Sequence, residues 1–82
     1  MAKKRQDHKK WFDKGRVLMG DGKHSESITA FTAAIDENTE FGKAYFERAV
    51  CFYKLGFYMK AENDLKAAAV LGCEEALFFS PV

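Results

Sequence analysis

The sequence predicts an all-α protein of two tandem helix-turn-helix repeats followed by a short fifth helix. The first observation is an internal repeat, because residues 11 to 39 meet residues of the same kind when they are moved forward by 34 positions. Apolar residues also recur at steps of three and four, and glycines separate the segments that contain them. Repeats of this length are typical of helical hairpins that stack and bury their apolar faces on each other. The matched pairs are Trp11 and Tyr45, Gly15 and Ala49, Leu18 and Phe52, Gly22 and Gly56, Ser27 and Ala61, Phe31 and Leu65, and Ala34 and Ala68.

The first repeat contains two predicted helices. One covers about residues 7 to 20, with Trp11 and Leu18 among its apolar positions, and the cluster Gly20-Asp21-Gly22 ends it. The other runs from residue 24 or 25 to residue 37 and follows serines that can cap its amino terminus. Its apolar face consists of Ile28, Phe31, Ala34 and Ile35.

The second repeat mirrors the first. A third helix is predicted from about residue 41 to residue 55, and Gly56 is its stop. A fourth helix is predicted from about residue 58 to residue 71, and Gly72 is placed to take the left-handed conformation that ends many helices. The gaps inside both repeats are so short that each helix pair must form an antiparallel hairpin.

A short fifth helix follows, and we expect it to cover the last hairpin. Glu74 and Glu75 complement the positive end of its dipole, Leu77 with Phe78 or Phe79 gives it an apolar face, and Ser80-Pro81 ends it. The chain therefore divides into a basic flexible tail, two repeats and a capping helix. These parts are residues 1–7, 8–40, 41–73 and 74–80.

The spacing of these residues resembles the tetratricopeptide repeat over about residues 9 to 75. That family alternates aromatic, small and apolar residues in the pattern that the matched pairs follow, although Lys14 and Arg48 stand where it has an apolar residue. The resemblance implies a right-handed α-solenoid that binds other proteins. It does not extend to the clamp for carboxy-terminal carboxylates, because Phe12, Arg16 and Glu47 occupy the positions of the clamp's lysines and asparagines.

In this family the first helix of each pair lines a concave groove, which implies a partner-binding groove that is basic and aromatic. The third helix supports this interpretation, because Phe46, Val50 and Tyr53 form a second apolar stripe besides the packing stripe of Tyr45, Ala49 and Phe52. We expect the groove to hold a protein or peptide with acidic and apolar residues. The groove residues are Lys9, Phe12, Arg16, Met19, Lys43, Phe46, Val50, Tyr53 and Lys54.

A second interpretation of the apolar stripe stays open. The fifth helix or a second copy of the chain could cover Phe46, Val50 and Tyr53, since apolar patches of this kind are rare on the surface of monomers. In the version with a second copy, the protein is a structural element that self-assembles through this stripe or through the end containing Leu77, Phe78 and Phe79. The sequence does not decide between a homo-oligomer and a module that binds another protein.

The composition argues against a catalytic activity and against a metal or cofactor site in this chain. The two histidines, His8 and His24, have no metal-ligand spacing, no phosphate-binding loop is present, and we expect neither cofactor nor catalytic residue. Glu62 and Asp64 are interpreted as solvated charges on a helix face. Cys51 and Cys73 are expected to be reduced thiols.

Charge and hydropathy predict a cytoplasmic protein without a membrane partner. Net charge is +1, but residues 1 to 16 contain seven Lys or Arg and two Asp, which gives +5. This basic run could contact phosphates, yet the first ten residues hold no aromatic side chain to stack on bases, so we do not expect nucleic acid as the partner. No apolar run approaches the ~20 residues that cross a bilayer.

Overall fold

The protein is built from five helices, which the computed structural model describes within residues 7–79. They are α1 (Asp7–Gly20), α2 (His24–Glu37), α3 (Gly42–Lys54), α4 (Tyr58–Val70) and α5 (Glu74–Leu77), and the described residues contain no strand. The prediction of an all-α protein with five helices is confirmed. Residues 1–6 of the predicted tail and the predicted stop at Ser80-Pro81 lie outside the described residues.

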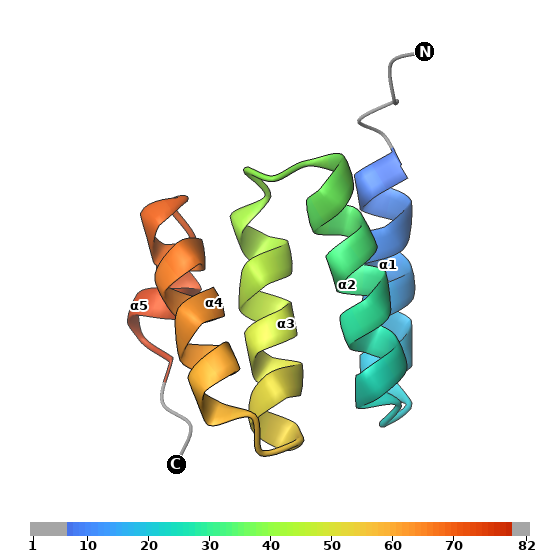
Figure 1. Ribbon diagram of the computed structural model, residues 1–82. Helices are drawn as coiled ribbons and strands as arrows, with labels where there is room; N and C mark the ends of the chain where they lie inside the picture. Colours follow the sequence, from blue (N-terminus) through green and yellow to red (C-terminus); the bar gives the residue numbers. More distant parts are fainter. Residues whose placement is uncertain (1–6, 80–82) are drawn as a thin grey trace.

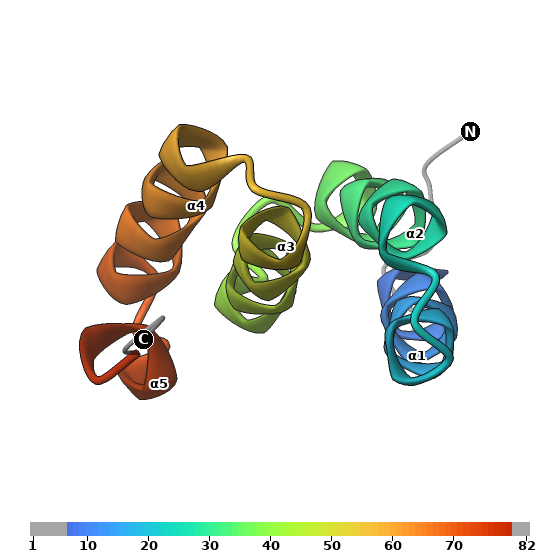
Figure 2. The same ribbon diagram turned by 90° about the horizontal axis from the view of Figure 1, so that it is seen from below.

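The helices α1 to α4 each run antiparallel to the next helix in the chain, and the short α5 lies against α4 (Figure 1). Seen from below, α1 and α2 lie at one end of the molecule, α4 and α5 lie at the other, and α3 lies between them (Figure 2). The second hairpin packs on the first through α2 and α3, so that α3 is the central element. The described part measures 43 × 28 × 17 Å, as expected for a small stack of helical hairpins.

The helix ends repeat the same hydrogen bonds. A glycine with positive φ follows α1, α3 and α4, and these glycines are Gly22, Gly56 and Gly72 with φ of 81°, 85° and 90°. In each case the next backbone N–H donates to the carbonyl five residues earlier, which completes a Schellman motif. The distances from the backbone nitrogen to the carbonyl oxygen are 2.9 Å from Lys23 to Leu18, 2.8 Å from Phe57 to Phe52 and 2.9 Å from Cys73 to Ala68. The prediction that glycines end these helices is confirmed.

The predicted bounds of the second helix are confirmed, but its predicted serine cap and the predicted end of the fifth helix are wrong. Serines do not cap α2, because the helix begins at His24 and Ser27 lies inside it, where its hydroxyl donates to the Lys23 carbonyl oxygen at 3.0 Å. The fifth helix is a single turn that ends at Leu77 and not at residue 80. The third helix begins at Gly42, one residue after the predicted start.

The core lies between the two hairpins and depends on small residues at matched positions. Ser27, Ala49 and Ala61 are completely buried, as the repeat pattern requires where helix backbones approach closely. Gly15 is buried against the ring of Phe31, so that a Cβ at this position would lie only 2.6 Å from the Phe31 Cε1. The buried residues of the main cluster are Phe12, Phe31, Ala34, Ile35, Ala44 and Cys51.

Candidate binding surface

The side of α3 that does not enter the core carries most of the predicted groove residues. Ala44, Ala49 and Cys51 are fully buried on the core side of the helix. On the opposite side the side chains are half-buried or exposed, except for Glu47, which is only 7% exposed. We call this side the α3 surface, and its residues are Lys43, Phe46, Glu47, Val50, Tyr53 and Lys54.

The α1 residues of the predicted groove divide into two groups. Lys9 and Arg16 are exposed. Phe12 is only 8% exposed, with its ring centroid 5.6 Å from that of Phe31 and 4.9 Å from that of Phe41. Met19 is half-buried and packs against the same core cluster. Phe12 therefore stabilises the first hairpin, and Arg16 is the α1 side chain that meets the α3 surface.

Ion pairs link α1, α3 and α5 across this side of the molecule. The Nε of Arg16 lies 4.0 Å from the Oε2 of Glu47, and the Nζ of Lys43 lies 2.5 Å from the Oε1 of Glu75. Burial raises the pKa of Glu47, while Arg16 and Lys43 oppose that rise. The surface is thus less basic than the predicted groove, because two of its cations have acidic partners.

An aromatic cluster covers part of the apolar stripe. Phe79, which follows α5, places its ring centroid 5.7 Å from that of Phe46 and 5.4 Å from that of Tyr53. The ring centroid of Tyr58 also lies 5.6 Å from that of Tyr53. Phe46, Val50 and Tyr53 nevertheless keep part of their surface exposed. The sequence left the cover of this stripe open between the fifth helix and a second copy of the chain. Phe79, which belongs to the predicted helix of residues 74–80, makes the contact from just beyond the observed end of α5.

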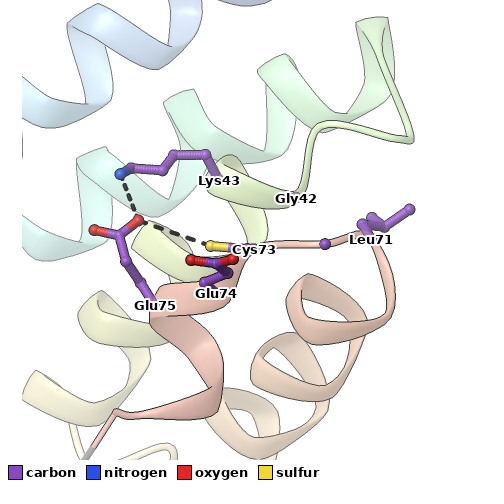
Figure 3. A pocket seen from close by; sticks show the side chains of 7 residues that line it. Gly42, Lys43, Leu71, Cys73, Glu74 and Glu75 are labelled. Carbon is purple, nitrogen blue, oxygen red and sulfur yellow. Dashed lines mark hydrogen bonds and ion pairs between the residues drawn. The ribbon is translucent and has the colours of Figure 1, made fainter.

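Beside the Lys43–Glu75 pair lies an open hollow of about 440 Å³. Figure 3 shows Lys43 and Glu75 pointing toward each other, with Cys73 between the ends of α4 and α5. The Cys73 Sγ lies 3.8 Å from the same Glu75 oxygen. Within residues 7–79 no group of three or more His, Cys, Asp or Glu side chains could hold a metal ion. The hollow therefore offers one ion pair and a thiol at the edge of the α3 surface. Its lining residues are Gly42, Lys43, Leu71, Gly72, Cys73, Glu74 and Glu75.

Arg48 and Asp64 form a buried ion pair on the core side of α3. Nε and Nη2 of Arg48 donate to the two carboxylate oxygens of Asp64 at 2.7 and 2.8 Å, and Nη1 donates to the Thr32 hydroxyl at 3.1 Å. The hydrogen bonds to the Asp64 carboxylate raise the pKa of Arg48, although burial opposes that rise. The interpretation of Asp64 as a solvated charge is wrong, because it is only 6% exposed. The repeat could have revealed this, since Asp64 matches the buried Ala30 in the first hairpin.

The thiol of Cys51 leads to a prediction on pH. Burial raises its pKa to about 11 from an ordinary 9.0. Above pH 9 the unfolded chain loses this proton before the folded chain does, so the free energy of unfolding falls between pH 9 and 11. Over this interval we expect the free energy of unfolding of Cys51→Ala to fall by about 1 to 3 kcal/mol less than that of the wild type. Urea unfolding at pH 8, 9, 10 and 11 measures the difference, and parallel curves for the two proteins would contradict the prediction.

The chain was compared with models of protein families, with curated proteins and with solved structures, and none of them matches it. Among the helices of residues 7–79, none has the length and apolar character that crossing a membrane requires.

Proposed function

We propose that this chain is a tetratricopeptide-like interaction module, a right-handed α-solenoid of two repeats and a capping segment that binds another protein through the α3 surface. The 34-residue sequence repeat supports the repeat assignment. So do the Schellman motifs at Gly22 and Gly56 and the buried small residues Ser27 and Ala61, each pair 34 positions apart. No catalytic group or cofactor is part of the proposal.

One observation carries the proposed binding site. Phe46, Val50 and Tyr53 stay partly exposed on a helix that already buries a full stripe in the core. The outer side of a helix in a monomer is ordinarily polar, so apolar side chains there indicate a surface that another molecule covers. Arg16 and Lys43 border these residues, which favours a partner segment with apolar anchors and acidic neighbours.

Self-assembly is the alternative function. Leu77 is 66% exposed and Phe78 is 82% exposed at the end of the same side of the molecule. A second copy could cover these residues together with the α3 surface, and the protein would then be a structural element.

Val50→Glu separates the two functions. The substitution places a charge in the middle of the apolar stripe, and we expect a loss of partner binding of about tenfold or more because one desolvated charge costs at least 1.4 kcal/mol. Partners captured by the wild type from its native cells are quantified by mass spectrometry, and sedimentation equilibrium follows the oligomeric state. Asn63→Glu, which adds the same charge at an exposed position of α4, is the matched control.

The outcomes are distinct. Loss of a partner by a folded Val50→Glu monomer, with retention by Asn63→Glu, supports the binding function. Dissociation of a wild-type oligomer by Val50→Glu favours self-assembly. A folded monomeric Val50→Glu variant that retains every partner would exclude both uses of the α3 surface.

A further inference from the structure

The segment of residues 74–79 touches the α3 surface at two chemically different points. The Glu75 carboxylate is paired with the Lys43 ammonium, and the Phe79 ring packs on Phe46 and Tyr53. The carboxylate and the ring are four residues apart in the sequence. Figure 3 shows the charged contact where α5 begins beside the first turn of α3. A segment that follows the second repeat thus fills the charged subsite and the aromatic subsite together.

Residues 74–79 make few buried contacts with the rest of the protein. α5 is a single turn without a buried residue, and both Leu77 and Phe78 point largely into solvent. Few buried apolar contacts mean a low free energy of local opening. The connection to α4 passes through Gly72, whose positive φ already forms a sharp turn. Residues 74–79 can therefore leave the α3 surface without disturbing the two hairpins.

We propose that residues 74–79 are a built-in ligand of the α3 surface, and that this surface accepts in their place a partner segment bearing a carboxylate and an aromatic side chain four residues apart. The inference rests on the proposed function and specifies its partner. It follows from complementarity: Lys43 requires a negative group, while Phe46 and Tyr53 offer an aromatic face that prefers another ring. The internal segment and the partner compete, so the free protein masks its own binding site.

The extent of this masking can be measured as a change in the dissociation constant of a ligand. A ligand that needs the open state binds more weakly in proportion to the fraction of molecules that are open. If residues 74–79 occupy the surface in about nine molecules of ten, a variant that releases them binds the same ligand about tenfold more tightly.

A peptide of the chain's own residues 74–79, EEALFF with blocked ends, is the probe. We expect its dissociation constant for the full-length Phe79→Ala variant to be about tenfold lower than for the wild type, because the aromatic subsite is then vacant. Fluorescence anisotropy measures the binding, and NMR shift changes at Lys43, Phe46 and Tyr53 locate it. A control peptide that itself carries Phe79→Ala should bind the wild type and the Phe79→Ala protein with equal affinity. Equal or weaker binding to the folded Phe79→Ala protein, or shift changes elsewhere, would overturn the inference.

A charge exchange tests the other contact without altering the aromatic cluster. Lys43 is partly exposed, so the full-length Lys43→Glu variant should keep its fold. We expect this variant to bind the peptide carrying Glu75→Lys about tenfold more tightly than the unmodified peptide, and the wild type to show the reverse order. If neither protein distinguishes the unmodified peptide from the Glu75→Lys peptide, the inference is overturned. That result would leave the proposed function intact, because partner loss in Val50→Glu tests it separately.

Discussion

Replacing Asp64 by alanine is expected to lower the free energy of unfolding by about 3 kcal/mol, because it leaves the Arg48 guanidinium without a counter-charge inside the protein. Both side chains are largely buried, with 18% of Arg48 and 9% of Asp64 exposed. The pair joins α3 to α4, and the third contact of Arg48, with Thr32, extends the network to α2. Domains of this size have only about 5 to 15 kcal/mol in total, so this single change removes a large part of it. Urea denaturation monitored by circular dichroism measures the loss.

Glu62→Ala is the matched control, since it removes an exposed carboxylate from the same helix. We expect it to change stability by less than about 0.5 kcal/mol. The double variant Arg48→Met/Asp64→Leu should recover most of the stability lost by Asp64→Ala, because neither charge is then buried. If the free energy of unfolding of Asp64→Ala lies within about 0.5 kcal/mol of the wild-type value, as is usual when an exposed ion pair is removed, the Arg48–Asp64 pair is not buried in solution.

Gly15→Ala is expected to destabilise the protein by about 1 to 3 kcal/mol, although alanine ordinarily favours a helix over glycine. The new Cβ would lie 2.6 to 2.9 Å from three carbon atoms of the Phe31 ring, and Phe31 is fully buried and cannot move aside freely. Ala49 occupies the matched position of the second hairpin, and in that hairpin the smaller Leu65 is the counterpart of Phe31. Thermal and urea unfolding of Gly15→Ala measure the effect.

Gly20→Ala supplies the control in the same helix, because, apart from its chain neighbours and the nearby backbone of its own helix, no atom lies within 4 Å of a Cβ at that position. We expect it to leave stability unchanged or to raise it by up to about 1 kcal/mol. A double-mutant cycle sharpens the test, since Phe31→Leu should reduce the cost of Gly15→Ala by relieving the collision. If Gly15→Ala lowers the free energy of unfolding by the same amount in the wild type and in Phe31→Leu, that result would contradict the packing described for the first hairpin.

The helices could be predicted from the sequence because local signals determine them. Gly22, Gly56 and Gly72 occupy the positions of positive φ that end three helices, and the repeated apolar steps define the helices between them. The buried small residues followed from the repeat as well. Serine capping of α2 was predicted wrongly, because Ser27 is needed as a small buried residue within the helix and bonds to the carbonyl of Lys23.

The contacts of the candidate surface depended on tertiary structure and could not be read from local patterns. Whether Phe12 faces a groove or the core depends on Phe41, which lies in the connection between the hairpins and packs on its ring. The pairing of Lys43 with Glu75 joins residues 32 positions apart. The contact of Phe79 with the α3 surface depends on how early α5 ends. Patterns along one helix contain no information on such distant partners.

Site-specific photocrosslinking tests the proposed binding function most directly. A photoreactive benzoylphenylalanine replaces Val50 on the α3 surface, and a control protein carries it instead of the exposed Asn63 on α4. Both proteins are expressed in their native cells, irradiated and analysed by mass spectrometry. We predict that position 50 crosslinks to a defined protein other than this chain and that position 63 does not. Crosslinks from position 50 only to a second copy of the chain, or equal crosslinks from both positions, would contradict the account.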